Sequence, residues 1–204
     1  YSNLMMPLEG IRVLDLSRIL AGPHAAQSLS DLGADVIKVE APWGDDSRTW
    51  GPPFQQGFDG GEVASYFLSC NRGKKIVFAN LKNERERVRS LMDTVDVVIE
   101  NFKPGAFDRL LGPVKPDLII CSISGYGQEG PRRDEPAFDL TMQARSGIMS
   151  VTGEEDGPPA KVGVAWIDVM TGMNAVSSIL ACLLRRNRGG GGARIDISLW
   201  DTAV

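Results

Sequence analysis

One carboxylate stands inside an otherwise apolar run in the second half of the sequence. The run K-V-G-V-A-W-I-D-V-M-T-G extends from Lys161 to Gly172, and Asp168 is its only acidic residue. An ionised carboxylate is costly to bury unless it is paired or hydrogen-bonded. Two compatible interpretations are open: Asp168 is the N-cap of the long helix that follows, or it is a functional carboxylate. A helix N-terminus would keep the carboxylate ionised, and an ionised, desolvated carboxylate is a candidate nucleophile.

A basic turn, N-R-G-K-K, forms a second group of residues with binding chemistry. Arg72, Lys74 and Lys75 place three cations within four positions, which suits a phosphate-bearing ligand. The alternative is a solvated surface turn without a ligand. With one histidine, His24, and no C-x-x-C pair, the sequence disfavours a metal site. The three cysteines are expected to be small core residues: Cys70, Cys121 and Cys182.

Strands alternate with helices along the whole chain. The expected strands are residues 11–16, 35–40, 76–79, 95–99, 117–124 and 194–198. The expected helices are residues 22–32, 83–93, 104–111, 138–149 and 169–186. Residues 41–62, rich in Gly, Pro, Asp and Gln, are expected to form a long functional or mobile loop. This alternation predicts an α/β fold with a Rossmann-like, doubly wound parallel sheet.

The carboxyl ends of the expected strands are the next place to look for a site, because doubly wound sheets bind ligands there. The residues expected there are Arg18 to Pro23, Glu40, Asn101, Phe102, Arg109, and Gly125 to Gly127. The first turn, R-I-L-A-G-P-H, has one glycine where the dinucleotide fingerprint requires three. NAD binding is therefore disfavoured.

Composition and length exclude several classes of protein. The chain has 204 residues and a net charge of −4, and mild acidity argues against a nucleic-acid platform. We find neither a signal peptide nor an apolar run of transmembrane length, so no membrane partner is expected. The expected location is intracellular: the cytoplasm, with the mitochondrial matrix as the alternative.

Eight segments, spread in order over the chain, carry a resemblance to a known family. They are P-L-E-G-I-R-V-L-D-L-S-R-I-L-A-G-P from Pro7, D-L-G-A-D-V-I-K-V-E-A-P from Asp31, Y-F-L-S-C-N-R-G-K-K from Tyr66, V-I-E-N-F-K-P-G-A-F-D-R-L from Val98, C-S-I-S-G-Y-G-Q-E-G-P from Cys121, Q-A-R-S-G-I-M-S-V-T-G from Gln143, D-V-M-T-G from Asp168 and R-I-D-I-S-L-W-D from Arg194. Together they resemble the family III (CaiB/BaiF-type) CoA-transferases. The segment G-D-D-S-R-T-W-G-P-P-F from Gly44 is most similar to the succinate/glutarate-type dicarboxylate enzymes.

The resemblance implies a reaction and a set of site residues. Asp168 would attack an acyl-CoA thioester and form a mixed anhydride, which the released CoA thiolate would convert into an enzyme–CoA thioester. Coenzyme A and acyl-CoA would be substrates, with no permanently bound cofactor and no metal. The implied CoA contacts are Arg18, Ile19, Leu20, Ala21, Asn71, Arg72, Lys74, Lys75, Asn101, Phe102 and Arg109. Ala41 departs from the family pattern, because an arginine usually stands at this position.

The resemblance also implies partners and a domain assignment. Residues 1–204 would be the N-terminal part of the large domain, without the small domain and the C-terminal return. Family members are roughly twice as long and form interlocked homodimers that act on acyl-CoA and a carboxylic acid acceptor. The chain is therefore expected to be a fragment, an incomplete gene model or a truncated paralogue.

Two other functions remain open from the sequence. An acyl-CoA racemase of the same family would need a histidine near Phe138, and the only histidine, His24, lies far away in the sequence. This disfavours racemisation. The other alternative is a non-catalytic CoA-binding or dimerisation paralogue.

Overall fold

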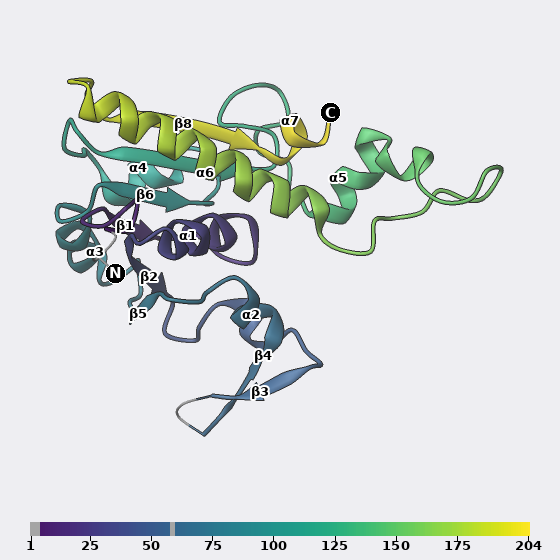
Figure 1. The fold of residues 1–204 in the computed structure, drawn as a ribbon, viewed down its shortest axis with the longest axis horizontal. Coiled ribbons are helices and arrows are strands. Elements are labelled where there is room, and N and C mark those ends of the chain that lie inside the picture. The colour runs from purple at the N-terminus through teal and green to yellow at the C-terminus, as the bar shows by residue number, and fades with distance from the viewer. Residues whose placement is uncertain (1–4, 58–59) are drawn as a thin grey trace.

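A computed structural model describes residues 5–57 and 60–204, and a six-stranded parallel sheet runs through its centre (Figure 1). The strand order is β5-β2-β1-β6-β7-β8. The strands are β1 (Arg12–Asp15), β2 (Asp35–Glu40), β5 (Lys75–Phe78), β6 (Val97–Glu100), β7 (Ile119–Ser124) and β8 (Ala193–Ser198). The chain winds outward from β1 to β5, returns beside β1, and winds outward in the other direction to β8. This order confirms the predicted doubly wound α/β fold.

Helices cover both faces of the sheet. The helices α1 (Ala21–Asp31) and α6 (Trp166–Asn187) pack on one face, and α3 (Arg85–Met92) and α4 (Ala106–Leu111) pack on the other. Successive side chains of β1 enter different cores, Val13 on the α1 side and Leu14 on the α3 side, because strand residues alternate between faces. Burial on both faces explains why the inner strands β6 and β7 are rich in apolar residues.

Helix α6 begins at Trp166, three residues before its expected start, and buries one stripe against α1 and the sheet. The close approach of α1 depends on Gly172. A Cβ atom there would lie 2.8 Å from the Ala21 carbonyl oxygen and 3.0 Å from Cδ2 of His24. The expectation that no apolar segment reaches transmembrane length was wrong, since α6 is long and apolar enough by length and composition. Its apolarity is explained by the core that it covers.

The segment between β2 and β5 is more ordered than predicted. Instead of one long loop, residues 41–62 contain the 3₁₀ helix η1 (Asp46–Thr49) and the strand β3 (Phe54–Gln56), which pairs antiparallel with β4 (Glu62–Ala64). A short helix, α2 (Ser65–Ser69), follows. Part of the expected loop, residues 58–59, lies outside the described residues. This hairpin extends away from the main sheet (Figure 1).

Three more elements complete the fold. They are α5 (Asp139–Ser146), η2 (Ile148–Val151) and α7 (Leu199–Ala203). In Figure 1, α5 and η2 project beyond the N-terminal end of α6, on the side toward which β8 points. One edge of the sheet, at the carboxyl ends of its strands, is therefore flanked by α5 and by the segment between β2 and β5. This segment, which contains η1, β3, β4 and α2, is called the hairpin segment below.

Candidate active site

The topological switch point lies between β1 and β6, where the chain changes its winding direction. Two hydrogen bonds connect the strand ends there. The backbone N–H of Arg18 donates to Asn101 Oδ1 at 3.0 Å, and Asn101 Nδ2 donates to the Arg18 carbonyl oxygen at 2.9 Å. Doubly wound sheets bind ligands in the crevice at this point. The structure thus brings together two predicted site residues that are 83 positions apart in the sequence.

A cleft of about 320 Å³ opens beside this point, between the carboxyl ends of β1, β2 and β5. Trp43, Phe102 and Leu110 give it apolar walls, and Arg18 and Lys82 bring positive charge. Arg18 forms only an exposed ion pair with Asp46, at 3.4 Å. Within the described residues, Lys82 has no acidic partner. Flat apolar walls with cations at the rim suit a nucleotide, whose base is aromatic and whose phosphates are anionic. Lys82 was missed by the sequence reasoning.

The basic turn is arranged differently from the prediction. The Lys74 side chain is fully buried, and its ammonium group donates to Asp15 Oδ2, the Pro23 carbonyl oxygen and Asn71 Oδ1, each at 2.8 Å. An ammonium group has three N–H donors, so Lys74 has none left for a phosphate. Asn71 is also buried, and its Nδ2 donates to the Phe67 carbonyl oxygen. The geometry therefore gives Lys74 and Asn71 an internal, supporting position.

The other two cations of the turn lie away from the cleft. Arg72 pairs with Asp31 at the end of α1, and Lys75 pairs with Asp35 at the start of β2, both at 2.6 Å. Asp35 is at the amino edge of the sheet, opposite the strand ends that form the site. Both cations thus form exposed ion pairs, and Arg72 also lines a separate pocket of about 830 Å³ together with Asn71 and Lys74. Arg109, in contrast, is exposed on α4 directly before Leu110, which lines the cleft.

Asp168 is the third residue of α6 and not its N-cap, which is Ala165. The N-cap interpretation was therefore wrong. Burial raises the pKa of Asp168 to about 7, and the negative charge of Asp139 contributes to the increase. The expectation that the helix N-terminus keeps the carboxylate ionised is corrected accordingly: burial makes Asp168 hold its proton to a much higher pH than an exposed aspartate does.

Asp139 is the neighbour that the sequence did not reveal. It is buried at the start of α5, and its Oδ2 accepts a hydrogen bond from the backbone N–H of Asp168 at 3.0 Å. Gln143, one turn later, donates from Nε2 to Asp139 Oδ1 at 2.5 Å and accepts from the N–H of Val162 at 2.8 Å. These bonds hold two carboxylates close together. In the sequence, Asp139 has only the pattern of an ordinary acid in a first helical turn.

Tyr66, on α2, lies near the same carboxylates and packs against Trp50. Burial and then the negative charge of Asp168 raise the pKa of Tyr66 to about 12. Its hydroxyl therefore keeps its proton at neutral pH and can donate a hydrogen bond. The Trp50 ring meets the Tyr66 ring edge-on, with centroids 5.5 Å apart. Both residues lie in segments that carry the family resemblance, but they were not predicted as site residues.

Two further side chains lie near the start of α6. The Thr171 hydroxyl, one turn after Asp168, is buried and has no hydrogen-bond partner among the described residues. His24 packs against Gly172. Burial, and then the charge of Lys74, lower the pKa of His24, which keeps the ring neutral. Although His24 is distant from Asp168 in the sequence, the fold brings it beside α6. The position near which a racemase histidine was expected holds Phe138.

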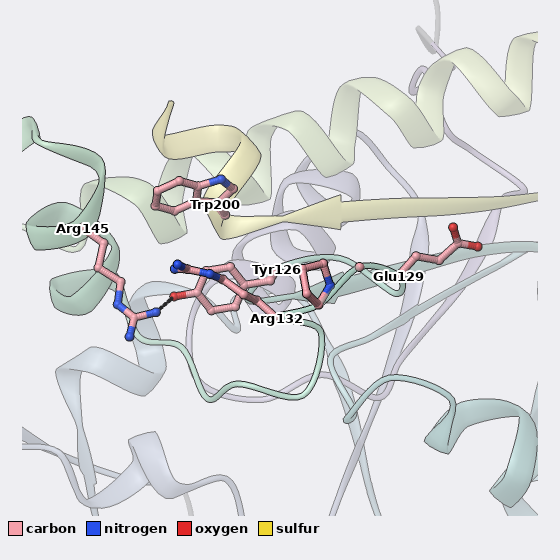
Figure 2. A pocket seen from close by; sticks show the side chains of 7 residues that line it. Tyr126, Glu129, Arg132, Arg145 and Trp200 are labelled. Atoms are coloured by element: carbon pink, nitrogen blue, oxygen red, sulfur yellow. Dashed lines mark hydrogen bonds between the residues drawn. The ribbon is translucent and has the colours of Figure 1, made fainter.

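A second pocket, of about 670 Å³, lies between the loop after β7, α5 and α7 (Figure 2). Arg145 points toward Tyr126, donates to its hydroxyl, and pairs with Glu135 at 2.7 Å. The Tyr126 and Trp200 rings lie 6.0 Å apart. Arg132 also lines the pocket and lies 3.9 Å from Glu135, so both arginines of the pocket face the same carboxylate. Within residues 5–57 and 60–204, no cluster of three potential metal ligands is found.

Comparison with known proteins identifies the family. The sequence model of CoA-transferase family III matches residues 8–204, nearly the whole chain. The chain belongs to CoA-transferase family III. The resemblance found in the eight sequence segments is thereby confirmed.

Individual relatives agree with this assignment. The chain is 49% identical to a succinate–glutarate CoA-transferase of Agrobacterium fabrum, over 98% of this chain and 52% of that protein. It is 46% identical to a succinyl-CoA:glutarate CoA-transferase of Mus musculus, over 98% of this chain and 47% of that protein. A crystal structure of a CaiB/BaiF family protein from Brucella suis superposes with a TM-score of 0.94 at 47% identity, covering 98% of this chain and 55% of that one. The chain thus spans about half the length of the curated relatives it matches.

Proposed function

We propose that this chain carries the nucleophile and the nucleotide cleft of an acyl-CoA:carboxylate CoA-transferase. The observation that carries the proposal is the largely buried Asp168, with a pKa of about 7, held beside Asp139 in a family III fold. Within the whole protein, residues 1–204 would form the N-terminal part of the large domain. The relatives named for succinate and glutarate support dicarboxylic acids as substrates.

The CoA nucleotide would occupy the cleft at the switch point. Its base would lie against Phe102 and Trp43, and Arg18, Lys82 and Arg109 would meet its phosphates. From the cleft, the loop of Ile19, Leu20 and Ala21 leads directly to α6, because the Ala21 carbonyl oxygen contacts Gly172. The pantetheine arm following this loop would bring the thioester toward Asp168. In this arrangement Arg72, Lys74 and Lys75 make no direct contact with CoA.

The chemistry begins with the ionised Asp168 carboxylate. One of its oxygens attacks the thioester carbonyl, the C–S bond breaks, and CoA leaves as a thiolate, which gives a mixed anhydride. The thiolate then attacks the aspartyl carbonyl, releasing the first acid as a carboxylate and leaving an aspartyl–CoA thioester. A second carboxylate attacks the aspartyl carbonyl of that thioester, the C–S bond breaks, and CoA leaves again as a thiolate, which gives a new anhydride. The thiolate then attacks the acyl carbonyl of this anhydride, which forms the new acyl-CoA and releases the Asp168 carboxylate. Asp168 is regenerated.

The surroundings of Asp168 fit these steps. Burial keeps water away from the anhydride, which would otherwise hydrolyse. A carboxylate with a raised pKa is also a stronger nucleophile than an exposed one, although only its ionised fraction reacts. Transfer should therefore increase with pH through about 7 as Asp168 loses its proton. Tyr66 and Trp50 would form one wall of the acyl pocket, with the Tyr66 hydroxyl as a hydrogen-bond donor to the acid. A second copy of the chain is the proposed protein partner.

The test is to trap the acyl-enzyme. After incubation with succinyl-CoA and then hydroxylamine, peptide mapping by mass spectrometry should find a hydroxamate on the peptide containing Asp168. The variant Asp168→Asn should show none, and Asp134→Asn, which changes an exposed acid, should react like the wild type. Binding of CoA without any hydroxamate would contradict catalysis and favour a non-catalytic CoA-binding chain.

A further inference from the structure

The loop that leads from the cleft to α1 has an unusual hydrogen-bond pattern. Every backbone group from Ser17 to Ile19 is bound by a side chain. The backbone N–H groups of Ser17, Arg18 and Ile19 donate, in this order, to the side chains of Asp15, Asn101 and Asp45. The carbonyl oxygens of the same three residues accept, in this order, from the side chains of Lys38, Asn101 and Cys70. Loops normally satisfy such groups with water or with neighbouring backbone. Here the protein fixes each peptide group separately.

The same loop contains a strained residue. Ile19 has a φ of 73°, in the left-handed region that β-branched residues rarely adopt. Such a conformation persists only where the surroundings impose it. The Asp45 carboxylate accepts from the Ile19 N–H at 3.3 and 3.4 Å, and Cys70 Sγ donates to its carbonyl oxygen at 3.6 Å. The strain at Ile19 is therefore maintained by contacts on both of its peptide groups.

A buried charge network supports the loop from below. The side chains of Asp15, Lys38, Asp45 and Lys74 are at most 1% exposed. Lys38 Nζ lies 3.1 Å from Asp45 and donates to the Ser17 carbonyl oxygen at 2.8 Å, and Lys74 pairs with Asp15 at 2.8 Å. Two cations thus balance two anions in the interior.

Such a network is an inefficient way to stabilise a fold. Removing charges from water costs several kcal/mol for each ion, and apolar side chains of the same volume often serve stability as well or better. The network is nevertheless concentrated at one place, where Ser17, Lys38 and Asp45 line the cleft. What it provides at this place is one fixed shape for the loop.

We propose that Lys38 and Asp45 are positioning residues that hold loop 17–21 in its binding shape before a ligand arrives. Asp15 and Lys74 complete the network and keep the charges balanced. The identification of the ligand as CoA rests on the function proposed above. The proposal that the network fixes the loop does not rest on that function. A loop ordered in advance loses little conformational entropy on binding, which increases affinity.

The test is the double variant Lys38→Met/Asp45→Asn. This variant removes the ammonium group that donates to the Ser17 carbonyl oxygen. It leaves Asp15 and Lys74 paired with each other, so neither of these buried charges loses its partner. The side-chain volumes stay similar. The matched control is Arg186→Met/Asp96→Asn. It removes an ion pair of 2.9 Å, 16% and 28% exposed, at the amino edge of the sheet.

Two measurements are made on the ligand-free and ligand-bound chains. Hydrogen exchange of the backbone amides in residues 17–21 reports the order of the loop, and calorimetry with CoA reports affinity. In the double variant we expect exchange in the loop to be about tenfold faster and CoA affinity about tenfold weaker, as for the loss of one charge-assisted hydrogen bond. The control should change neither. Should the double variant fail to fold, Asp45→Asn alone should shift both quantities in the same direction by a smaller amount.

The outcomes separate the two proposals. Unchanged exchange in the loop would overturn the positioning role, whatever happens to CoA. Faster exchange with unchanged CoA affinity would show that the loop shape does not serve binding, and would also overturn it. A wild-type chain that does not bind CoA would refute the proposed function, and the exchange comparison would still decide whether the network orders the loop.

Discussion

The pair of carboxylates at the start of α5 and α6 permits a sharp prediction: the variant Asp139→Asn should lower the pKa of Asp168. Burial is the main cause of the raised pKa, and the charge of Asp139 is the second cause. Removing only the second cause should move the pKa of Asp168 below about 7 but leave it above the ordinary value of 3.8. The wild-type shift, from 3.8 to about 7, corresponds to roughly 4 kcal/mol opposing ionisation, at 1.36 kcal/mol per pKa unit.

The same shift determines a pH dependence of stability. Because the pKa of Asp168 is higher in the folded state, the folded protein binds this proton more tightly than the unfolded chain does. The resulting stabilisation is complete below pH 3.8, decreases as the pH rises, and is lost above about pH 7. Relative to Asp168→Asn, the wild type should therefore lose up to roughly 4 kcal/mol of unfolding free energy across this window. The Asp139→Asn variant should lose less unfolding free energy than the wild type across the same pH window, because the pKa of its Asp168 is raised less.

Carbon NMR of labelled aspartate side chains measures the pKa directly, with Asp168→Asn to assign the signal. Urea unfolding at several pH values gives the corresponding free energies. Asp134→Asn removes an equal charge from a side chain that is 83% exposed, and should leave the Asp168 titration unchanged. A wild-type Asp168 that titrates near 4 would refute the burial argument. A pKa that stays near 7 in Asp139→Asn would show that the neighbouring charge has no effect.

Three other predictions concern packing and binding. Gly172→Ala should destabilise the fold by about 1–3 kcal/mol in urea unfolding, because the added Cβ would meet α1. The control is Gly163→Ala, whose Cβ would lie in open space and which should lower the unfolding free energy much less. Thr171→Val should not lower the unfolding free energy and should raise it by up to about 2 kcal/mol, since it removes a buried hydroxyl without a partner; a loss of stability would mean that the hydroxyl is bonded. Arg109→Glu should weaken CoA binding in calorimetry by about tenfold or more, whereas Arg188→Glu should not; equal affinities of both variants would exclude Arg109 from the site.

The centre of the sheet could be predicted from the sequence because the inner strands β2, β1, β6 and β7 are largely buried on both faces. Strand β2, for example, matches its prediction residue for residue: its three β-branched residues lie between turn residues, and five of its six residues are buried. The hairpin of β3 and β4 was missed for the opposite reason. All three residues of β3 are exposed, so no burial pattern marks it as a strand.

The site was predicted less completely, because its decisive contacts join distant residues. Asp168 was recognisable as a lone carboxylate in an apolar run. Its partner Asp139, 29 positions away, was not, since a contact between two helix starts leaves no local pattern. Lys74 shows the converse case, in which the fold gives a side chain contacts that its local pattern does not indicate. A lysine in a basic turn has the pattern of a surface cation, and only the fold reveals that it reaches Asp15, 59 positions away.

The hairpin segment between β2 and β5 has a consequence for how such a protein can evolve. Trp50 and Tyr66 both belong to this segment, whose described strands β3 and β4 pair with each other and not with the main sheet. Mutations, insertions or deletions there can reshape the surface that faces the carboxylates while the sheet register remains unchanged. Asp168 and the switch point lie outside this segment, on α6 and on the strands of the main sheet. Changes in the segment can therefore alter the surroundings of Asp168 without changing the helix that carries it.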